Sequence, residues 1–269
     1  MTDPSLEFVG TATSILRLGP FTLLTDPNFL HKGQRAYLGK GLFSKRRTEP
    51  SLQPDQLPPL DAILLSHLHG DHFDRVAKKE LDRQLPIFTT GHAQRRLHKW
   101  GFEQATAVQT WSSRTLERDD TGLTITAVPG THAPNLVKPL LPPVMGSVLE
   151  LDSGSGRPFR LYISGDTLYR PWLREITDRC GHLDAAIVHL GGTKILGSIL
   201  VTMDGSQGAD LVQLLQPSLT VPIHYDDYTV FRSPLSDFEQ EWHRRELPGQ
   251  LRLVHRGDTI SLTVDTEHR

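Results

Sequence analysis

The stretch Ser66-His67-Leu68-His69-Gly70-Asp71-His72 follows directly on the apolar run Ala62-Ile63-Leu64-Leu65. Four consecutive apolar residues between polar neighbours are too short for a helix, so the run predicts a buried strand. Four potential metal ligands then fall within six residues. A polar loop with incidental histidines is the alternative, but with 13 histidines in 269 residues such a cluster is hard to credit to chance. Imidazole and carboxylate together suit zinc, manganese or iron(II), so the stretch predicts a metal site.

The geometry of a strand end allows these four side chains to converge. Successive side chains of a strand point to opposite faces, so His67 and His69 can point the same way. Gly70 then lets the backbone turn, and Asp71 and His72 can reach the same space from another direction. A buried cluster of this kind is costly without a cation to satisfy it.

Length and composition narrow the class of protein. A chain of 269 residues, 37% of them hydrophobic, can bury a substantial core as one large domain or two small ones. The net charge of −2 gives no global field that would favour nucleic acid or an anionic membrane. The single cysteine, Cys180, excludes an internal disulfide and a cysteine-based zinc cage, and it fits a reducing compartment.

The sequence shows no secretory or membrane-spanning signal. The N-terminus, Met1-Thr2-Asp3-Pro4-Ser5, lacks a basic segment followed by an apolar one. No run reaches the roughly 18 apolar residues that a spanning helix needs. We therefore expect a cytoplasmic protein with no stable membrane insertion and no nucleic-acid partner.

The first half of the chain predicts strands followed by an alternation of strands and helices. Strands are expected over 6–18 and 21–25, and Asp26-Pro27 ends the second because proline lacks a ladder donor. Residues 28–59 show no sustained period and predict a long surface excursion, in which the basic triplet 45–47 favours a solvated patch. The remaining elements expected here are a helix at 74–85 capped by Asp74, a strand at 86–90 and a helix at 92–100.

The second half repeats this plan of strands followed by a parallel strand–helix alternation. Hairpins are expected about the turns at 119–122 and 153–158. No composition shift or linker separates the halves, so we expect one domain over residues 1–269, with two packed sheets and helices outside. The further expected elements are a helix at 171–180, a strand at 184–190, a helix from Asp204 or Ser206 to residue 216, a strand at 219–223, a helix at 235–247 and a terminal hairpin about Gly257-Asp258.

Three further residues stand at the ends of other predicted strands. His132 follows a strand and a Pro-Gly turn, Asp166 follows a strand and a glycine, and His224 ends a strand. Each alone is more often a turn or capping residue. Together with the first four they form a strong candidate set, because a catalytic metal site is assembled from the ends of several strands.

These residues and motifs together resemble the metallo-β-lactamase-fold hydrolase superfamily in its dinuclear form. The similarity covers nearly the whole chain, and its motif is specific for fold and metal site but not for substrate. Within the superfamily the chain looks most like the branch that holds ascorbate-6-phosphate lactonases and N-acylphosphatidylethanolamine-hydrolysing phospholipase D. The segments that carry this closer resemblance are 24–29, 57–67, 164–167 and 222–224.

The resemblance implies an α/β fold, a four-layer αββα sandwich with an internal pseudo-repeat. It also implies two divalent metal ions, with zinc favoured and manganese or iron as alternatives. A hydroxide bridging the metals would be the nucleophile, and Asp71 could orient it or accept its proton. The implied ligands are His67, His69 and His132 for the first ion, Asp71, His72 and His224 for the second, and Asp166 as the bridge between them.

By this resemblance we expect a hydrolase that cleaves an ester, lactone or phosphodiester bond in a small or lipid-like substrate. Two alternatives stay open: a ribonuclease-type phosphodiesterase of the same superfamily, and a non-catalytic metal-bound regulatory protein on this fold. The slightly acidic charge and the lack of a basic stripe disfavour the first. The complete set of seven ligands disfavours the second.

Weaker predictions concern the surroundings of the site. His189 ends a predicted buried strand and can support a ligand or contact the substrate, although a satisfied core histidine is an equal interpretation. Tyr225 directly follows His224 and can orient it. The apolar loops 136–145 and 195–203 predict a rim for an apolar or acyl group, with burial against the body or a homo-oligomer interface as the alternative. The remaining histidines are expected at the surface: His31, His92, His98, His182, His243, His255 and His268.

Overall fold

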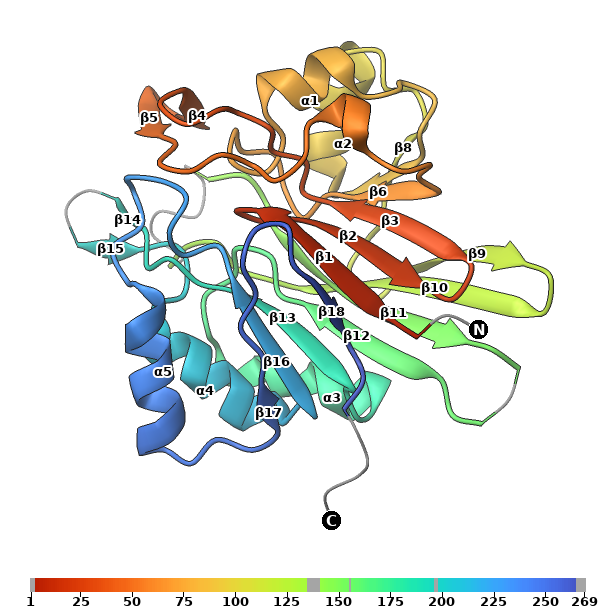
Figure 1. Ribbon diagram of the computed structural model, residues 1–269, viewed down its shortest axis with the longest axis vertical. Helices are drawn as coiled ribbons and strands as arrows, with labels where there is room; N and C mark the ends of the chain where they lie inside the picture. Colours follow the sequence, from red (N-terminus) through yellow and green to blue (C-terminus); the bar gives the residue numbers. More distant parts are fainter. Residues whose placement is uncertain (1–2, 135–140, 155, 196–197, 265–269) are drawn as a thin grey trace.

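The chain folds into two β-sheets that pack face to face, with helices against both outer surfaces (Figure 1). The computed structural model describes residues 3–134, 141–154, 156–195 and 198–264. Within this part of the chain, each of the two large sheets has seven strands. The four-layer αββα sandwich expected from the sequence is confirmed.

The first sheet begins as an antiparallel meander and continues with parallel strands. In spatial order its strands are β18 (Thr259–Ser261), β1 (Ser5–Gly10), β2 (Thr13–Leu18), β3 (Phe21–Thr25), β6 (Ala62–Leu64), β7 (Ile87–Thr89) and β8 (Ala105–Ala107). The pairs from β18 to β3 are antiparallel, and those from β3 to β8 are parallel.

The second sheet repeats this order of antiparallel and then parallel pairs. Its strands are β17 (Gln250–Leu251), β16 (Leu219–Ile223), β13 (Ala185–His189), β12 (Phe159–Ile163), β11 (Met145–Asp152), β10 (Thr121–Pro129) and β9 (Ser113–Arg118). The pairs from β9 to β12 are antiparallel, and those from β12 to β17 are parallel. The two sheets therefore show the repeated plan that the sequence predicts.

Apolar side chains on both faces of each sheet separate the layers. Leu23 of β3 and Leu161 of β12 lie in the core between the sheets. Leu24, the next residue of β3, faces the opposite way and packs with Ala77 and Leu97 under the helices of the first sheet. Because both faces are buried, these strands have nearly continuous apolar sequences rather than alternating ones.

Helices cover the outer face of each sheet. α1 (Arg75–Glu80) and α2 (Gly91–Lys99) lie over the first sheet. α3 (Glu175–Cys180), α4 (Gly205–Leu215) and α5 (Leu235–Arg244) lie over the second, preceded by the 3-10 turn η3 (Pro171–Arg174). None of the helices in the described ranges is long and apolar enough to cross a bilayer.

The excursion over residues 28–59 is more ordered than its sequence predicts. It contains the hairpin of β4 (Arg35–Gly39) and β5 (Leu42–Lys45) and the 3-10 turn η1 (Pro54–Gln56). The expected solvated patch is wrong for Arg46, which is completely buried and pairs with Asp227. The hairpin forms because it docks on the loop that carries the first four predicted ligands, where Gly70 donates to the carbonyl oxygen of Tyr37.

Two expected elements have different boundaries or partners. The helix capped by Asp74 ends at Glu80 rather than at residue 85, because a turn in which Asp82 accepts from the N–H of Gln84 replaces its last turn. The expected terminal hairpin is wrong: β17 pairs with β16 in the second sheet, whereas β18 pairs with β1 in the first. Each strand fills the free edge of its own sheet.

Candidate metal centre

The predicted ligands meet at one edge of the sandwich, beyond the carboxyl ends of its strands. β6 leads into residues 66–72, β12 leads to Asp166 and β16 leads to His224. His132 follows β10, which runs in the same direction as β12 because both pair antiparallel with β11. In parallel sheets, ligands bind beyond the carboxyl ends of the strands. The structure brings all seven predicted residues together there, in two adjacent groups.

His67, His69 and His132 form the first group, and their ligand nitrogens lie within 4.8 Å of one another. Nδ1 of His69 lies 3.0 Å from Nε2 of His67 and 3.2 Å from Nε2 of His132. Nδ1 of His132 lies 2.7 Å from the carbonyl oxygen of Val201. Since a carbonyl oxygen only accepts, Nδ1 carries the proton and Nε2 is left as the free ligand nitrogen.

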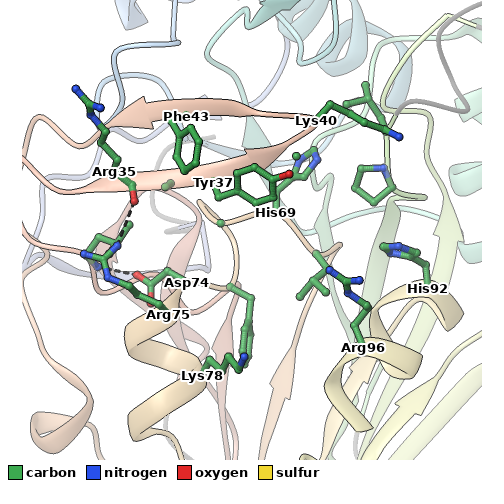
Figure 2. Close-up of a pocket in the computed structure, with 18 of the residues that line it drawn as sticks. Arg35, Tyr37, Lys40, Phe43, His69, Asp74, Arg75, Lys78, His92 and Arg96 are labelled. Atoms are coloured by element: carbon green, nitrogen blue, oxygen red, sulfur yellow. Dashed lines mark hydrogen bonds between the residues drawn. The ribbon is translucent and has the colours of Figure 1, made fainter. Parts of the chain in front are cut away.

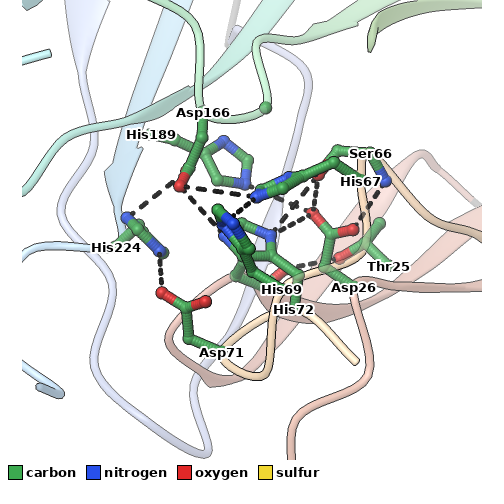
Figure 3. Close-up of polar contacts among 12 residues, drawn as sticks. Thr25, Asp26, Ser66, His67, His69, Asp71, His72, Asp166, His189 and His224 are labelled. Atoms are coloured by element: carbon green, nitrogen blue, oxygen red, sulfur yellow. Dashed lines mark hydrogen bonds and ion pairs between the residues drawn. The ribbon is translucent and has the colours of Figure 1, made fainter. Parts of the chain in front are cut away.

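Asp71, His72, Asp166 and His224 form the second group, whose ligand atoms also lie within 4.8 Å of one another. Oδ2 of Asp166 lies 3.2 Å from Nε2 of His72 and 3.9 Å from Nε2 of His67, so it reaches toward both groups. Oδ1 of Asp166 lies 3.6 Å from Nδ1 of His224, whose Nε2 lies 3.6 Å from Oδ2 of Asp71. Figure 3 shows Asp166 in this central position.

Burial keeps the histidines of the first group uncharged. It lowers the pKa of His67 well below the ordinary value, that of His69 to about 3, and that of His132 below its usual range. Neighbouring histidines add to the effect at His67 and His69, because two adjacent imidazolium ions repel each other. Neutral imidazoles offer the lone pairs that a metal ion binds.

In the second group, neighbouring charges outweigh burial. The charges of His224 and His72 hold the pKa of Asp166 well below its usual value, and the close approach of His224 and the charge of His72 lower the pKa of Asp71. Asp166 and Asp26 raise the pKa of His72 well above normal, and Asp166 and Asp71 raise that of His224. Protons on the histidines thus balance the carboxylates, and a divalent cation would replace those protons.

Each residue of the second group has a buried polar atom without a hydrogen-bond partner among the described residues. Buried polar atoms are nearly always satisfied, so four such atoms in one cluster need an explanation. All four belong to residue types that bind zinc, manganese or iron, and a cation at their centre would satisfy them. The atoms are Oδ1 of Asp71, Nε2 of His72, Oδ1 of Asp166 and Nε2 of His224.

The structure adds Asp26, whose place before Pro27 predicts only the end of a strand. Its Oδ2 lies 3.0 Å from Nδ1 of His72 and 3.7 Å from Nε2 of His189. The backbone N–H and the hydroxyl of Ser66 donate to its two oxygens at 2.7 and 2.9 Å. Asp26 follows β3, the neighbour of β6, so it carries the same strand-end signal that identified Asp166.

His189 is buried at the end of β13, behind the second group. Its ring stacks on that of His72 with centroids 6.1 Å apart, and its Nδ1 lies 3.3 Å from the hydroxyl of Ser164. Asp26, His72 and His189 themselves offer three ligand atoms within 4.8 Å of one another. Its Nε2 is buried without a hydrogen-bond partner among the described residues, which does not fit a satisfied core histidine. That His189 supports a ligand stays a prediction.

Two glycines allow the ligand loops to approach so closely. Gly165 has a φ of +59°, and a Cβ there would lie 2.9 Å from the carbonyl oxygen of Met145. A Cβ on Gly70 would lie 2.6 Å from the carbonyl oxygen of Tyr37 in the β4–β5 hairpin. Gly70 is therefore required by this close approach, rather than by a left-handed turn.

Tyr225 packs against the apolar core between the second sheet and its helices. Burial raises the pKa of its phenol to about 12, so it is neutral at physiological pH. Within the described chain, no hydrogen bond or ring contact joins it to the seven predicted ligands. That Tyr225 orients His224 stays a prediction.

The two apolar loops border the metal centre where the structure describes them. Residues 136–140 and 196–197 lie outside the described residues. Leu141, Ile195 and Val201 line a cavity of about 30 Å³ that is also lined by residues of both ligand groups. The described parts of both loops therefore lie beside the candidate ligands.

The family model described as Beta-lactamase superfamily domain matches residues 22–225 of the chain. The chain is also similar to the UPF0173 protein YddR of Bacillus subtilis, at 26% identity over 248 residues that cover 87% of this chain and 91% of that protein. A UPF0173 metal-dependent hydrolase of Thermococcus onnurineus is 24% identical over 191 residues, which cover 70% of this chain and 76% of that protein.

Solved structures show the same fold at low sequence identity. A possible metal-dependent hydrolase from Veillonella parvula superposes with a TM-score of 0.80 at 20% identity. The superposition covers 97% of this chain and 100% of that protein. An isothiocyanate hydrolase from Delia radicum gut bacteria also gives a TM-score of 0.80, at 17% identity, with 97% and 100% of the two chains covered. At such identities the likeness establishes the fold alone.

Proposed function

Because the chain belongs to the beta-lactamase superfamily, we propose that it hydrolyses an ester, lactone or phosphodiester bond with two divalent metal ions. At the coarser level it is a metal-dependent hydrolase, in agreement with the names of its relatives. The observation that carries the finer proposal is the convergence of seven His and Asp side chains in two groups linked through Asp166. The substrate that we propose is small or lipid-like.

Each group would hold one ion, and Asp166 would contact both. Zinc is favoured for this donor set, and manganese and iron are the alternatives, because imidazole and carboxylate ligands suit all three. The residues proposed for the first ion are His67, His69 and His132, and those for the second are Asp71, His72 and His224.

The residues of the site supply complementary chemistry around the reacting bond. Ions held by these residues would lower the pKa of a coordinated water and polarise the oxygen of the bond that is cleaved. Asp71 lines the small cavity beside the other proposed ligands, so its carboxylate would lie next to a coordinated water molecule, which it could orient or deprotonate. Asp26 contacts Nδ1 of His72, and this contact would keep Nε2 of the same ring directed toward Asp166.

The neighbourhood of the small cavity supports an apolar group next to the reacting bond. Leu38 and Leu42 of the β4–β5 hairpin line it, together with Ile195 and Val201. Burial of an acyl or other apolar group against these side chains would contribute roughly 0.8 kcal/mol per methylene. Turnover that does not change with acyl chain length across an ester series would contradict this part of the proposal.

The test is turnover of a substrate panel by protein that has been stripped of metal and then reloaded. The panel contains an aryl acetate, a lactone and an aryl phosphodiester, each measured without metal and with zinc, manganese or iron(II). We expect no turnover of the stripped protein and recovery with at least one metal. Full activity after rigorous metal removal would contradict the proposal.

A further inference from the structure

A second, larger pocket adjoins the metal centre across the β4–β5 hairpin. Leu38 and Leu42 of the hairpin line the small cavity of about 30 Å³, whereas Tyr37 and Phe43 line a pocket of about 860 Å³. His69 lines both spaces, so the larger pocket begins at a predicted metal ligand. A volume of this size is within the range of small-molecule sites.

The wall of this pocket carries cations that lack anionic partners. Lys40 comes from the hairpin, Lys78 from α1 and Arg96 from α2 (Figure 2). None of these three forms an ion pair within the described ranges. Among the described residues that line the pocket, Asp74 is the one carboxylate, and it is already occupied. Its oxygens accept from the backbone N–H groups of Phe29, Leu30, Val76 and Ala77.

Arg35 and Arg75 also line the pocket but serve other contacts. Arg75 donates to the backbone carbonyl oxygen of Arg35 at 3.2 Å. Figure 2 shows the guanidinium of Arg35 directed away from the other cations. The cations available to a ligand are therefore those near His69 and Trp100.

The ring of Trp100 contacts two of these cations, Lys78 and Arg96. Nζ of Lys78 lies 4.3 Å from the ring centroid of Trp100, and Cζ of Arg96 lies 6.0 Å from the same centroid. A cation–π contact orients a cation without neutralising it. Two like charges beside one ring therefore raise the local positive potential, although the chain as a whole has a net charge of −2.

His92 adds a polar group to the same wall. Its Nδ1 is buried and has no hydrogen-bond partner among the described residues. Burial and the charges of Arg95 and Arg96 lower its pKa, so the ring is neutral and can donate or accept one hydrogen bond. Figure 2 shows His92 beside Arg96, on the side of the pocket that Lys40 borders.

We propose that this pocket binds an oxyanion, a carboxylate or a phosphate, on an apolar or aromatic body, as the non-reacting end of the substrate. The planar guanidinium of Arg96 suits a bidentate contact with such a group, and Lys40 and Lys78 add charge. Trp100 and Phe43 offer aromatic surface to the body. The bond that is cleaved would lie beside His69, a placement that rests on the proposed hydrolase function.

Calorimetry on the metal-loaded protein tests the pocket without any turnover. The probes are naphthoate, naphthyl phosphate and the neutral naphthol, and the comparison of the two anions identifies the preferred acid. We expect both anions to bind more tightly than naphthol and Arg96→Gln to weaken them at least about tenfold, as expected for a hydrogen bond to a charged group. Lys99→Gln is the matched control, because Lys99 is exposed on the same helix and does not line the pocket.

Kinetics then connect the pocket with the reaction. The measured quantity is the ratio of kcat/KM for a naphthyl ester that carries a carboxylate to kcat/KM for its neutral analogue. Arg96→Gln should lower this ratio about tenfold, whereas Lys99→Gln should leave it unchanged. Equal losses for both esters, equal losses in the two variants, or tight binding of naphthol would overturn the inference. Arg96-dependent anion binding without turnover of any ester would instead refute the hydrolase proposal and leave the pocket standing.

Discussion

At the scale of the single residue, Asp26 is the side chain that fixes the orientation of His72. Its carboxylate accepts from Nδ1 of His72 at 3.0 Å, which leaves Nε2 free on the side of Asp166. The backbone of Asp26 has a φ of +36°, which is unfavourable for a residue with a Cβ. Contacts with Ser66 and His72 hold it there. Carboxylates behind metal-binding histidines typically set the tautomer and strengthen the ligand.

Asp26→Asn tests this role. An amide can still accept a hydrogen bond from His72 but loses the charge, so we expect metal affinity to fall about 10–100-fold. Competition with a chromophoric chelator measures the affinity. Asp178→Asn serves as the control, since Asp178 is exposed on α3 and should leave the affinity unchanged. Equal affinity of Asp26→Asn and wild type would show that Asp26 is only a structural residue.

The sequence predicts the seven candidate ligands because each stands just beyond a recognisable strand. Asp26 also stands just beyond a strand, but the sequence does not identify it as a site residue. The proline that follows it already explains why the strand ends there. The prediction for Tyr225 rests on its adjacency to His224 alone, and in the structure its side chain packs against the apolar core. Adjacency along the chain says little about a side chain at a strand end, because successive residues leave in different directions.

At the scale of the element, the β4–β5 hairpin lies between the candidate metal centre and the larger pocket that Lys40, Lys78 and Arg96 line. It docks where Gly70 donates to the carbonyl oxygen of Tyr37 at 3.0 Å. Its sequence alone predicts only a loop, because two short strands of a hairpin are marginal without a surface to pack on. That surface is supplied by a loop about 30 residues later in the chain, which local sequence patterns cannot show.

Gly70→Ala should displace this hairpin. The new Cβ would lie 2.6 and 2.8 Å from the carbonyl oxygen and nitrogen of Tyr37, so either the hairpin or the ligand loop must shift. We expect a loss of about 1–3 kcal/mol in the free energy of unfolding, as is typical of overpacking, together with reduced turnover. Urea denaturation measures the first effect.

Gly91→Ala is the matched control for that experiment. Gly91 begins α2, and a Cβ there would meet no atom closer than 3.6 Å. The free energy of unfolding should stay equal or rise slightly, because alanine favours the helix. A Gly70→Ala protein as stable as the Gly91→Ala protein would show that the hairpin is not held by this contact.

At the scale of the whole molecule, a buried ionic cluster joins the two halves. Arg46 lies at the end of the first-half hairpin, and its Nη2 is 3.7 Å from Oδ1 of Asp227, three residues after His224. Asp227 also accepts from the backbone N–H of Thr11 at 2.7 Å and from Arg256 at 2.9 Å. Arg46 and Asp227 are both completely buried. We propose that this cluster and the core between the sheets make the chain one folding unit.

Asp227→Ala should therefore destabilise the entire protein. It leaves Arg46 buried without its partner, a change that typically costs about 3–5 kcal/mol. Denaturant unfolding should show one lowered transition for fluorescence and circular dichroism alike. Asp210→Ala, which removes a partly exposed partner of Arg245, should cost no more than about 1 kcal/mol. Equal effects of the two substitutions, or separate transitions for the two probes, would contradict the single unit.

The layered architecture follows from the sequence more directly than the connections between its halves do. Apolar strands such as Ala62–Leu64 and Leu219–Ile223 predict buried parallel strands, and both are confirmed. The basic cluster around Arg46 predicts a solvated patch, and this is wrong because Arg46 is buried against Asp227. A partner that stands 181 residues later cannot be inferred from the local sequence. The predicted hairpin of β17 and β18 is wrong for a similar reason. Each strand pairs with the free edge of a different sheet, and the turn between them does not determine this pairing.

The most direct test of the metal centre is elemental analysis of the purified wild type and of Asp166→Asn, with Asp178→Asn as control. Asp166 lies between the two ligand groups, so its carboxylate is the one whose loss should affect both ions. The account predicts about two divalent ions per chain in the wild type and in the control. It predicts fewer ions, with loss of turnover, in Asp166→Asn. At most one ion per chain in saturated wild type, or unchanged metal content and turnover in Asp166→Asn, would contradict it.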